Sequence, residues 1–462
     1  MTEISRRSIL KGAGIVGAAL ITPATIRSLI SEANAATLVE PKRIYSKNGV
    51  LSVTLEAKPV MVAYNGTKRW ALGYNGSVPG PTLVAKPGDT LRITLRNSTT
   101  MMTNLHTHGL HVPPVKNGDN PMIMIDPKKS FNYEIKIPKN QKSGTFWYHP
   151  HHHEFVAKQV HAGLAGAIII TDDVDTQSAF AQTTDRVLIF ADPRIGTDSS
   201  VMETSMMDQM HGRSGPAVMI NGQPSPTIYG NAGKTERWRL INACPSTYLD
   251  LTVENCDIYL LSTDGGRLDK PLLVPGINMT PGQRYEVLIK PKKSGMLRIS
   301  NSGNVIGFFK TANTNFIKLE SLVLPAYSIA KPTSTRTLNI KGAGMMNMGG
   351  GMGNHEMSFT FDGKAFDPKV VNQKVKLGTT EQWIINNPTN MHHPFHIHAW
   401  DFQIADNGDG SSVRGWKDTV NIPSQGSVKI NIDFRDFGGT TVYHCHILDH
   451  EDGGMMGIVQ VS

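Results

Sequence analysis

A stretch near the C-terminus combines the residue types that bind soft metal ions. Residues 444–455 read HCHILDHEDGGM. The residues before it are β-branched and aromatic, so we expect His444 to His446 to end a strand. Because side chains alternate across a strand, Cys445 then points to one face and the two histidines beside it to the other. His450 and Met455 return to the Cys445 side after a turn. A thiolate, an imidazole and a thioether, completed by one more histidine from elsewhere in the chain, form a blue-copper ligand set.

Histidines elsewhere in the chain fall into pairs of the same kind. The chain has 17 histidines and five His-x-His pairs, where random scattering would give roughly 0.6 pairs. The groups are His106-Thr107-His108-Gly109, Trp147-Tyr148-His149-Pro150-His151, His393-Pro394-Phe395-His396-Ile397-His398 and the 444–446 stretch. Imidazole suits copper, zinc, iron and nickel alike, so histidine alone does not choose the metal. Cys445 together with Met455 favours copper.

The elements that must position these residues are strands. Short runs rich in Val, Ile, Leu and Thr alternate with Gly, Pro and Asn turns, which predicts an all-β chain. The predicted strands include Leu51–Leu55, Thr90–Leu95, Ala167–Thr171, Val187–Phe190, Arg237–Ile241 and Arg284–Ile289. Three similar segments, Lys86–Asp89, Tyr229–Gly233 and Lys376–Gly378, each precede a strand, which indicates repeated sandwich domains. At roughly 150 residues a domain, we predict three domains, over residues 36–175, 176–330 and 331–462.

The N-terminus has the pattern of an export signal. Ser5-Arg6-Arg7 begins a twin-arginine motif, and Ala33-Asn34-Ala35 suits a signal peptidase. The apolar run between them, Gly12–Ile26, is shorter than the about 20 residues that a membrane span needs. We therefore interpret residues 1–35 as a twin-arginine signal peptide. The protein is expected to be exported already folded, to the periplasm or another extracytoplasmic space.

Charge and cysteine content limit the classes of partner. The net charge of +8 is not concentrated in any Lys/Arg run, which argues against a nucleic-acid groove. Three cysteines are too few for a disulfide framework. Cys244 and Cys256 flank a predicted strand, and whether they pair stays open at this stage. We expect a monomer that binds no nucleic acid and does not insert into a membrane.

The four histidine groups together resemble a known family. H-x-H-G, W-Y-H-P-H, H-P-F-H-I-H and H-C-H-I-x-x-H-x-x-x-G-M occur in the order seen in three-domain multicopper oxidases, the laccase and cuprous oxidase superfamily. Two motifs lie in the first predicted domain and two in the third. The resemblance covers essentially the whole chain after the signal segment. It implies three consecutive cupredoxin-like Greek-key β-sandwiches, four copper ions, and one-electron oxidations coupled to four-electron reduction of O2 to water.

The resemblance also implies a role for each matching residue. The type 1 copper would be bound by His393, Cys445 and His450, with Met455 as the weak axial ligand. The type 2 copper would take His106 and His396. The type 3 pair would take His108, His149 and His446 on one ion and His151, His398 and His444 on the other. Glu451 matches a carboxylate that relays protons in the family, and Asp119 is a second candidate in a loop whose spacing differs. The middle domain would hold no copper.

The electron donor is predicted from the methionines. An axial Met455 resembles the lower-potential metallo-oxidases. Met391 matches a methionine that holds substrate Cu(I) in copper-tolerance oxidases, although Thr389 stands where those enzymes have an aspartate. Thioethers suit Cu(I), and further candidates in a glycine-rich stretch are Met345, Met346, Met348 and Met352. Met202, Met206 and Met210 recur every four residues, for which core packing is the alternative. We predict an oxidase of Cu(I), of phenols or of both, with a role in copper tolerance.

Other functions fit less of the pattern. A copper nitrite reductase would not need a full type 3 ligand set. A non-enzymatic structural or division protein of the superfamily would be expected to have lost ligands, and none is missing. A protein that only sequesters copper has no need of eight cluster histidines. A laccase acting mainly on organic donors remains the alternative within the family.

Overall fold

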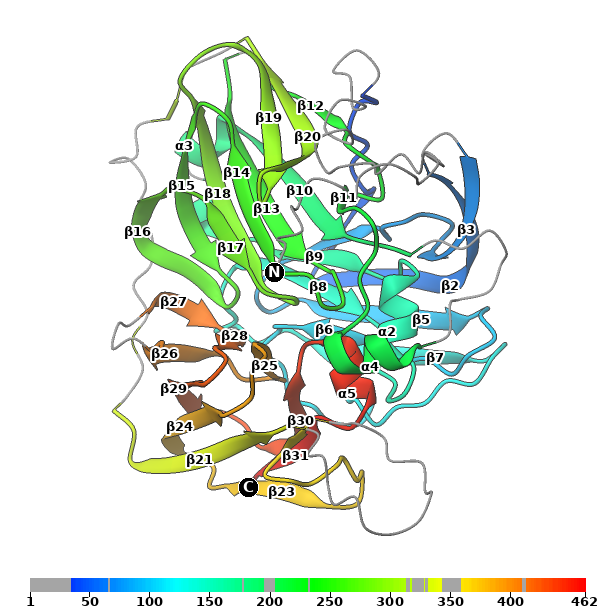
Figure 1. Cartoon of the computed structure of the whole chain (residues 1–462), viewed down its shortest axis with the longest axis vertical. Coiled ribbons are helices and arrows are strands. Elements are labelled where there is room, and N and C mark those ends of the chain that lie inside the picture. The colour runs from blue at the N-terminus through cyan, green and yellow to red at the C-terminus, as the bar shows by residue number, and fades with distance from the viewer. Residues whose placement is uncertain are drawn as a thin grey trace, which may run out of the picture.

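The computed structural model is built almost wholly from strands. It describes residues 35–64, 67–176, 178–194, 204–231, 233–312, 316–317, 328, 331–342, 359–408 and 413–462. Over these residues the strands form six sheets, arranged as three two-sheet sandwiches (Figure 1). The all-β prediction is therefore confirmed. The predicted signal peptide, apart from its last residue, and the methionines at 345, 346, 348 and 352 lie outside the described residues.

The first sandwich, blue to cyan in Figure 1, holds the first two histidine motifs. Its strands are β1 (Arg43–Tyr45), β2 (Val50–Tyr64), β3 (Thr67–Tyr74), β4 (Thr82–Ala85), β5 (Thr90–Asn97), β6 (His106–His108), β7 (Ser130–Lys136), β8 (Gly144–His149) and β9 (Gly166–Ile170). The sheet orders are β3-β2-β5-β7 and β1-β4-β9-β8-β6. The histidine-bearing strands β6 and β8 are neighbours at one edge.

The middle sandwich, green in Figure 1, carries none of the predicted metal ligands. Its strands are β10 (Thr183–Ala191), β11 (Met219–Ile220), β12 (Thr227–Tyr229), β13 (Thr235–Asn242), β14 (Leu249–Val253), β15 (Cys256–Thr263), β16 (Gly266–Val274), β17 (Ile277–Met279), β18 (Arg284–Pro291), β19 (Gly295–Asn301) and β20 (Asn304–Thr311). The sheet orders are β11-β10-β13-β18-β15-β16 and β12-β20-β19-β14-β17. Cys244 and Cys256, on either side of β14, are both free thiols, so they do not pair.

The third sandwich, yellow to red in Figure 1, holds the other two motifs. Its strands are β21 (Ser334–Lys341), β22 (Thr360–Phe361), β23 (Val371–Val375), β24 (Thr379–Asn387), β25 (His393–Ile397), β26 (Phe402–Asp406), β27 (Val413–Lys417), β28 (Thr419–Ile422), β29 (Gly426–Phe434), β30 (Gly439–Cys445) and β31 (Met456–Val461). The sheet orders are β22-β21-β24-β29-β26-β27 and β23-β31-β30-β25-β28. The domain boundaries predicted from sequence remain predictions, but the sheets divide between β9 and β10 and between β20 and β21.

The three sandwiches repeat one arrangement. The strands after the three similar segments are β5, β13 and β24, and each pairs in parallel with an early strand of its sandwich, β2, β10 and β21 respectively. Each also pairs antiparallel with a later strand, β7, β18 and β29. All six strands predicted from sequence are present. The burial pattern shows which face of a strand packs on the core. In β29, for example, buried and half-buried residues alternate because one of its faces packs on the core.

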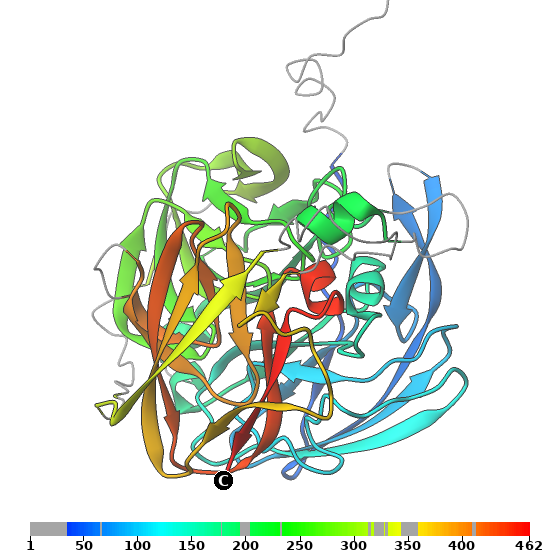
Figure 2. The same cartoon turned by 60° about the horizontal axis from the view of Figure 1, so that its bottom comes forward.

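Helices are short and few among the described residues. They are α2 (Val156–His161), η2 (Asp173–Thr176), α3 (Ser178–Ala181), α4 (Met206–His211) and α5 (Leu448–Asp452). Helix α5 contacts both α2 and α4, so one helix from each sandwich region meets at a single place (Figures 1 and 2). No described helix is long and apolar enough to cross a membrane.

The first and middle sandwiches meet over a mixed apolar and charged surface. Trp147 of β8 packs with Ile189 and Ile241 of the middle sandwich in one buried cluster. Beside it, Glu286 accepts a hydrogen bond from Thr145 of the first sandwich at 2.9 Å, and it also pairs with Arg237 and Arg239. Several further carboxylates and guanidinium groups join the same network. These charges are buried but matched, which is the condition for tolerating charge away from water.

Candidate metal centres

Cys445 is the last residue of β30, as the alternation argument requires. It lies opposite Phe395 of β25, while His444 lies opposite His396. Cys445 belongs to the buried core of the third sandwich, together with Met455. His444 and His446, which point to the other face, contact the rings of the first sandwich's histidines. One residue therefore separates two different buried environments.

On the core side, Cys445 meets two imidazoles. Its Sγ lies 3.7 Å from His393 Nδ1 and 3.8 Å from His450 Nδ1. Metal bonds of about 2.0 Å to nitrogen and 2.3 Å to sulfur, 120° apart in a trigonal plane, place those atoms about 3.7 Å apart. The spacing thus fits one ion bound by all three groups. The backbone carbonyl of Met455 accepts the Cys445 N–H at 3.0 Å, which brings Met455 back beside Cys445.

Hydrogen bonds hold these two imidazoles in the tautomer that a metal needs. His450 Nε2 lies 3.2 Å from the backbone carbonyl of Met210 in α4. A carbonyl can only accept, so the proton is on Nε2 and Nδ1 offers its lone pair toward Cys445. His393 Nε2 contacts the Thr389 hydroxyl at 3.1 Å. Burial lowers the pKa of His393 to about 3 and of His450 to about 4, so both rings are neutral near pH 7.

On the other side of Cys445, eight buried histidines converge from the first and third sandwiches. Register positions them in pairs: His106 lies opposite His149 across β6 and β8, and His396 lies opposite His444 across β25 and β30. Two rings of the first sandwich stack on rings of the third, His106 on His398 at 3.7 Å and His108 on His396 at 3.8 Å between centroids. The full set, none more than 2% exposed, is His106, His108, His149, His151, His396, His398, His444 and His446.

The nitrogens of this cluster are arranged as ligands around ions. The Nε2 atoms of His151, His398 and His444 lie 3.1–3.2 Å from one another. Bonds of about 2.0 Å to one shared ion would give a nitrogen spacing of about 3.3 Å in tetrahedral geometry. This trio is one of the groups predicted from sequence, and its atoms could hold one metal ion.

Outward hydrogen bonds leave other cluster nitrogens without a partner. His149 and His396 each donate from Nδ1 to a backbone carbonyl, of Pro150 and Asp418 respectively, at 2.8 Å. Their Nε2 atoms are buried and have no hydrogen-bond partner, as are His106 Nε2 and His108 Nδ1. Buried polar atoms without partners are rare. The donor set therefore fits bound metal ions, which would take up these lone pairs.

The two carboxylates predicted to relay protons both touch the cluster. Asp119 accepts the Thr107 N–H at 3.0 Å, and its two oxygens lie 3.0 and 3.1 Å from His106 Nδ1. Burial raises the pKa of Asp119 to about 7. Glu451 lies between His151 Nε2, at 3.2 Å, and His444 Nδ1, at 3.0 Å. Asp119 is therefore hydrogen-bonded to the cluster, whereas Glu451 is close to it but neither of its oxygens has a hydrogen-bond partner among the described residues.

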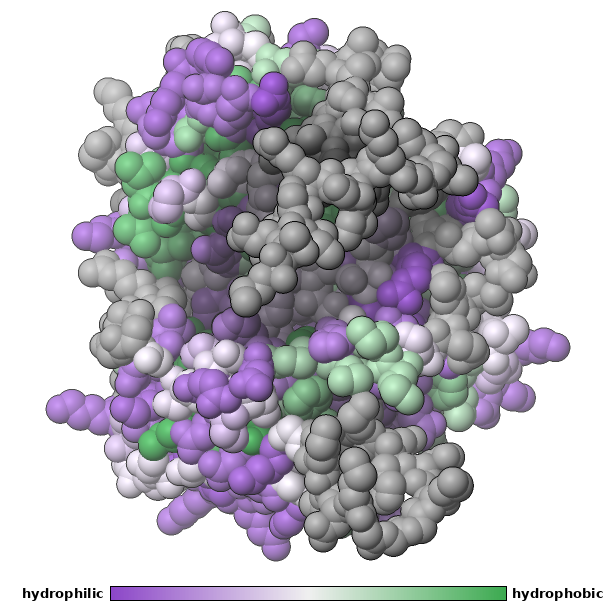
Figure 3. Space-filling view, in the orientation of Figure 1, coloured by the Kyte–Doolittle hydropathy of each residue, from purple (hydrophilic) through white to green (hydrophobic). Residues whose placement is uncertain are grey.

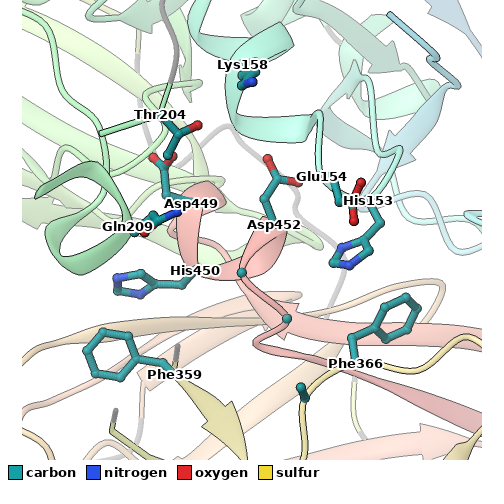
Figure 4. A pocket seen from close by; sticks show the side chains of 13 residues that line it. His153, Glu154, Lys158, Thr204, Gln209, Phe359, Phe366, Asp449, His450 and Asp452 are labelled. Atoms are coloured by element: carbon teal, nitrogen blue, oxygen red, sulfur yellow. The ribbon is translucent and has the colours of Figure 1, made fainter. Parts of the chain in front are cut away.

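A cavity opens beside His450. Its volume is about 440 Å³, and its walls come from α2, α5 and the segments around Phe359 and Phe366 (Figure 4). The ring of Phe359 lies 4.5 Å from that of His450 and 4.7 Å from that of His393. Small molecules in this cavity would come close to the imidazole of His450.

The methionines near this site differ from one another in exposure. Met206 and Met207 of α4 are 69% and 63% exposed, which excludes core packing for both. An apolar patch is visible in Figure 3 where α4 stands in Figure 1. Met391 is half-buried, two residues before His393. Met202 lies outside the described residues, so the predicted four-residue spacing is seen only from Met206 to Met210.

Comparison with known proteins places the chain among its relatives. Profiles of multicopper oxidase domains match residues 56–175, 147–321 and 337–462. A multicopper oxidase of Staphylococcus aureus is 31% identical over 441 residues, which cover 92% of this chain and 91% of that protein. The chain belongs to the multicopper oxidase family. It is therefore an oxidoreductase, and copper is its cofactor.

Other multicopper oxidases and their relatives extend the comparison. A solved multicopper oxidase from Campylobacter jejuni, described as a metallo-oxidase, is 30% identical and has a TM-score of 0.81, with 92% of this chain and 95% of that chain covered. The cell division protein FtsP of Proteus mirabilis is 26% identical over 500 residues, which cover all of this chain and 99% of that protein. Enzymes and a division protein thus share this architecture.

Some contacts of this multicopper oxidase have no counterpart in the sequence reasoning. Asp418 bonds to two cluster histidines, and Arg284 of the middle sandwich pairs with Asp418 at 2.6 Å. Arg213 holds Asp449 of α5 at 2.7 Å, next to His450. Asp418 lies in the segment Trp416–Val420, which also resembles the family, but its partner could not be read from the sequence.

Proposed function

We propose that this multicopper oxidase takes single electrons from Cu(I) and couples four such oxidations to the reduction of O2 to two waters. The balanced reaction consumes four Cu(I), one O2 and four protons and releases four Cu(II). The observation that carries the proposal is the position of Cys445, between a trigonal Cys-His-His site and an eight-histidine cluster. Phenols are the second donor class, because a cavity opens beside His450.

The proposed ligand sets follow the family pattern. His393, Cys445, His450 and Met455 hold a type 1 copper, and His106 and His396 hold the type 2 copper. His108, His149 and His446 hold one type 3 ion, and His151, His398 and His444 hold the other. The spacing of the His151 trio and the orphaned nitrogens of the remaining rings support four ions in all.

The chain supplies the electron path and its insulation. When bound, copper supplies the one-electron redox steps and the reduction of O2. Cys445 connects the two regions covalently, because its Sγ faces the type 1 site and its peptide bonds lead to His444 and His446. All three residues are fully buried. Burial excludes water from this path and holds the two sites at a fixed separation.

Two carboxylates supply protons. Glu451 is within reach of His151 and His444, and a proton on one of its oxygens would move toward the cluster from there. Asp119 does the same beside His106. In the metal-free protein, burial raises the pKa of Asp119 to about 7, which is the range that suits a group that takes up and releases protons near neutral pH.

Methionines occur in the segments next to both histidines of the proposed type 1 site. On the His450 side, α4 brings the Met210 carbonyl to the imidazole, and Met206 and Met207 of the same helix are exposed. On the His393 side stand Met391 and Thr389, and the Thr389 hydroxyl contacts His393 Nε2. Soft sulfur ligands suit Cu(I). This supports Cu(I) as donor and a role in copper tolerance, with the twin-arginine segment directing the folded protein out of the cytoplasm.

The deciding experiment compares donors. Oxygen uptake by the copper-loaded protein is measured with Cu(I) and with a phenol in parallel. Faster turnover with Cu(I) is expected, and faster turnover with the phenol would make the protein a laccase with an axial Met. If four coppers and the blue colour are present but neither donor drives uptake, the oxidase proposal is wrong and copper binding without turnover takes its place.

A second experiment locates the donor site. Replacing Met206, Met207 and Met210 by Leu is expected to raise the KM for Cu(I) about tenfold, which corresponds to about 1.4 kcal/mol of binding. The rate with a phenol should stay within a factor of two. Met391→Leu tests the His393 side in the same way. Met61→Leu, an exposed methionine on β2, is the matched control. Unchanged kinetics in all variants would remove the methionines from the proposal.

A further inference from the structure

The middle sandwich, which supplies none of the proposed ligands, reaches the histidine cluster through one loop. Gly282, just before β18, has φ +87°, and a Cβ there would lie 2.9 Å from two ring atoms of His446. Only glycine fits this approach. The Gly282 N–H donates to the carbonyl of Asn242, which fixes the loop to β13. The backbone of the middle sandwich is therefore one wall of the cluster.

Two residues beyond Gly282, Arg284 extends into the same region. It is fully buried, and each of its five N–H groups has an acceptor. Nη1 donates to Asp418 Oδ1 at 2.7 Å and Nη2 to Asp418 Oδ2 at 2.6 Å, a two-pronged pair. The other three donors reach the carbonyls of Thr145 (3.2 Å), Gly282 (3.3 Å) and Asp264 (2.9 Å). Such full engagement leaves the guanidinium one position.

Asp418 connects the guanidinium group of Arg284 to two histidines of the cluster. Its Oδ1 lies 3.1 Å from His108 Nε2 and accepts the Thr419 hydroxyl at 2.9 Å. Its backbone carbonyl accepts His396 Nδ1 at 2.8 Å. A carboxylate that faces a guanidinium accepts hydrogen bonds, so the proton of His108 lies on Nε2. His108 Nδ1 is then the nitrogen left without a partner.

We propose that Arg284 and Asp418 are positioning residues for the histidine cluster: they hold His108 as its Nε2–H tautomer and so aim Nδ1 inward. The middle sandwich thereby takes part in the redox centre without ligating it. Removing Arg284 leaves a buried, uncompensated carboxylate. Asp418 then loses the two-pronged partner that fixes its carboxylate, so its contact with His108 Nε2 is no longer held in place. Such outer contacts typically change metal affinity by about 10- to 100-fold.

The direct test reads the tautomer in metal-free protein. Protein labelled with 15N-histidine is examined by long-range 1H–15N NMR, and the His108 signals are assigned by their loss in His108→Gln. In the unaltered protein, Nε2 of His108 is expected to carry the proton. In Arg284→Met, a mixture of tautomers or Nδ1–H is expected, with Arg284→Lys intermediate. An unaltered protein with His108 as Nδ1–H would overturn the proposal.

A matched control separates positioning from stability. Arg267 is also fully buried in the middle sandwich and pairs with Asp172 at 2.7 Å and Asp175 at 2.8 Å of the neighbouring region, not with Asp418. Arg267→Met should lower the melting temperature as Arg284→Met does, but should leave the His108 tautomer and copper retention unchanged. Equal effects of the two variants on copper retention would mean that Arg284 acts only through stability.

Copper retention gives the second readout. Dialysis against a chelator of graded affinity is expected to strip the cluster of Arg284→Met about 10- to 100-fold more easily, while the blue absorption persists. If Arg284→Met does not fold, the double variant Arg284→Met/Asp418→Leu removes both buried charges and the acceptor for His108 Nε2. Retention and tautomer both unchanged in the double variant would refute the proposal. The inference rests on the proposed ligand set, but the tautomer measurement needs no copper and no turnover, so it stands or falls separately from the oxidase proposal.

Discussion

The two metal centres are built in opposite ways. The proposed type 1 ligands all belong to the third sandwich, and three of the four lie between Cys445 and Met455. The cluster takes half of its eight histidines from each of two sandwiches, and a loop of the middle sandwich forms a wall beside it. The first is a local site that one sandwich can form. The second exists only when the sandwiches are assembled, so copper binding there is coupled to assembly.

The largest effect expected from this difference is the loss of the type 1 site while the cluster keeps its copper. Cys445→Ser removes the thiolate, so the blue absorption and the oxygen uptake should both fall to background. The cluster should still bind its copper, because its ligands are on the other face of β30. Copper content and electron paramagnetic resonance check this. Loss of the cluster copper as well would mean that the two sites are not independent.

The next effect is on stability. Anything that binds only the folded state stabilises it, by about 4 kcal/mol at 1,000 times its dissociation constant. Removing all copper should therefore lower the melting temperature markedly, and most of the loss should persist in Cys445→Ser, which keeps only the cluster ions. The comparison is made by calorimetry with and without chelator. A shift that disappears in Cys445→Ser would place the stabilisation at the type 1 site instead.

The smallest effect concerns a contact between the first and third sandwiches that needs no metal. His111 Nδ1 lies 2.7 Å from the Ala399 carbonyl and Nε2 lies 2.5 Å from Asp436. Although burial opposes it, Asp436 raises the pKa of His111. Burial likewise opposes the effect of His111, which lowers the pKa of Asp436. The raised histidine pKa gives stability that is complete below about pH 6.5 and is lost as pH rises through the folded value.

Asp436 limits the same stabilisation at low pH. A lowered pKa gives stability that is present above about pH 4 and is lost as pH falls. Asp436→Asn should therefore destabilise the metal-free protein by about 1 kcal/mol near pH 5.5, a modest value because water screens Asp436, and by less near pH 8.5. Melting temperatures at both pH values test this. Asp433→Asn, in an exposed pair with Arg435, is the control, and a penalty that grows with pH would contradict the assignment.

Much of this molecule could be predicted because its signals are local. Short runs rich in Val, Ile, Leu and Thr between turn residues located six strands, and the repeated segments before β5, β13 and β24 indicated repeated sandwiches. The order of the histidine motifs indicated the family, and the structure brings the eight cluster histidines together. His151, His398 and His444 converge from three separate motifs. Local patterns suffice where chemistry needs particular side chains at fixed spacing.

The rest depends on contacts between distant segments. Arg284 and Asp418 are 134 positions apart, and neither type is unusual in its own surroundings. The group that selects the His450 tautomer is the Met210 carbonyl, 240 positions away, and a backbone carbonyl has no residue signature. The Thr389 hydroxyl beside His393 was recognised only as a departure from the family. These contacts follow from how the sandwiches dock, which no single motif specifies.

The buried ion network between the first and middle sandwiches has a consequence for exchanging parts between relatives. Arg43 of the first sandwich pairs with Asp185 of the middle one at 3.1 Å, and Arg267 of the middle sandwich pairs with Asp172, which follows β9, at 2.7 Å. Beside them, Glu286 pairs with Arg237 and Arg239 and accepts a hydrogen bond from Thr145. A chimaera that imports a foreign middle sandwich would bury charges whose counterparts differ, at a cost of about 3–5 kcal/mol for each broken pair. The exchange of whole sandwiches between relatives is therefore limited at this interface, and charged residues on its two sides must change together.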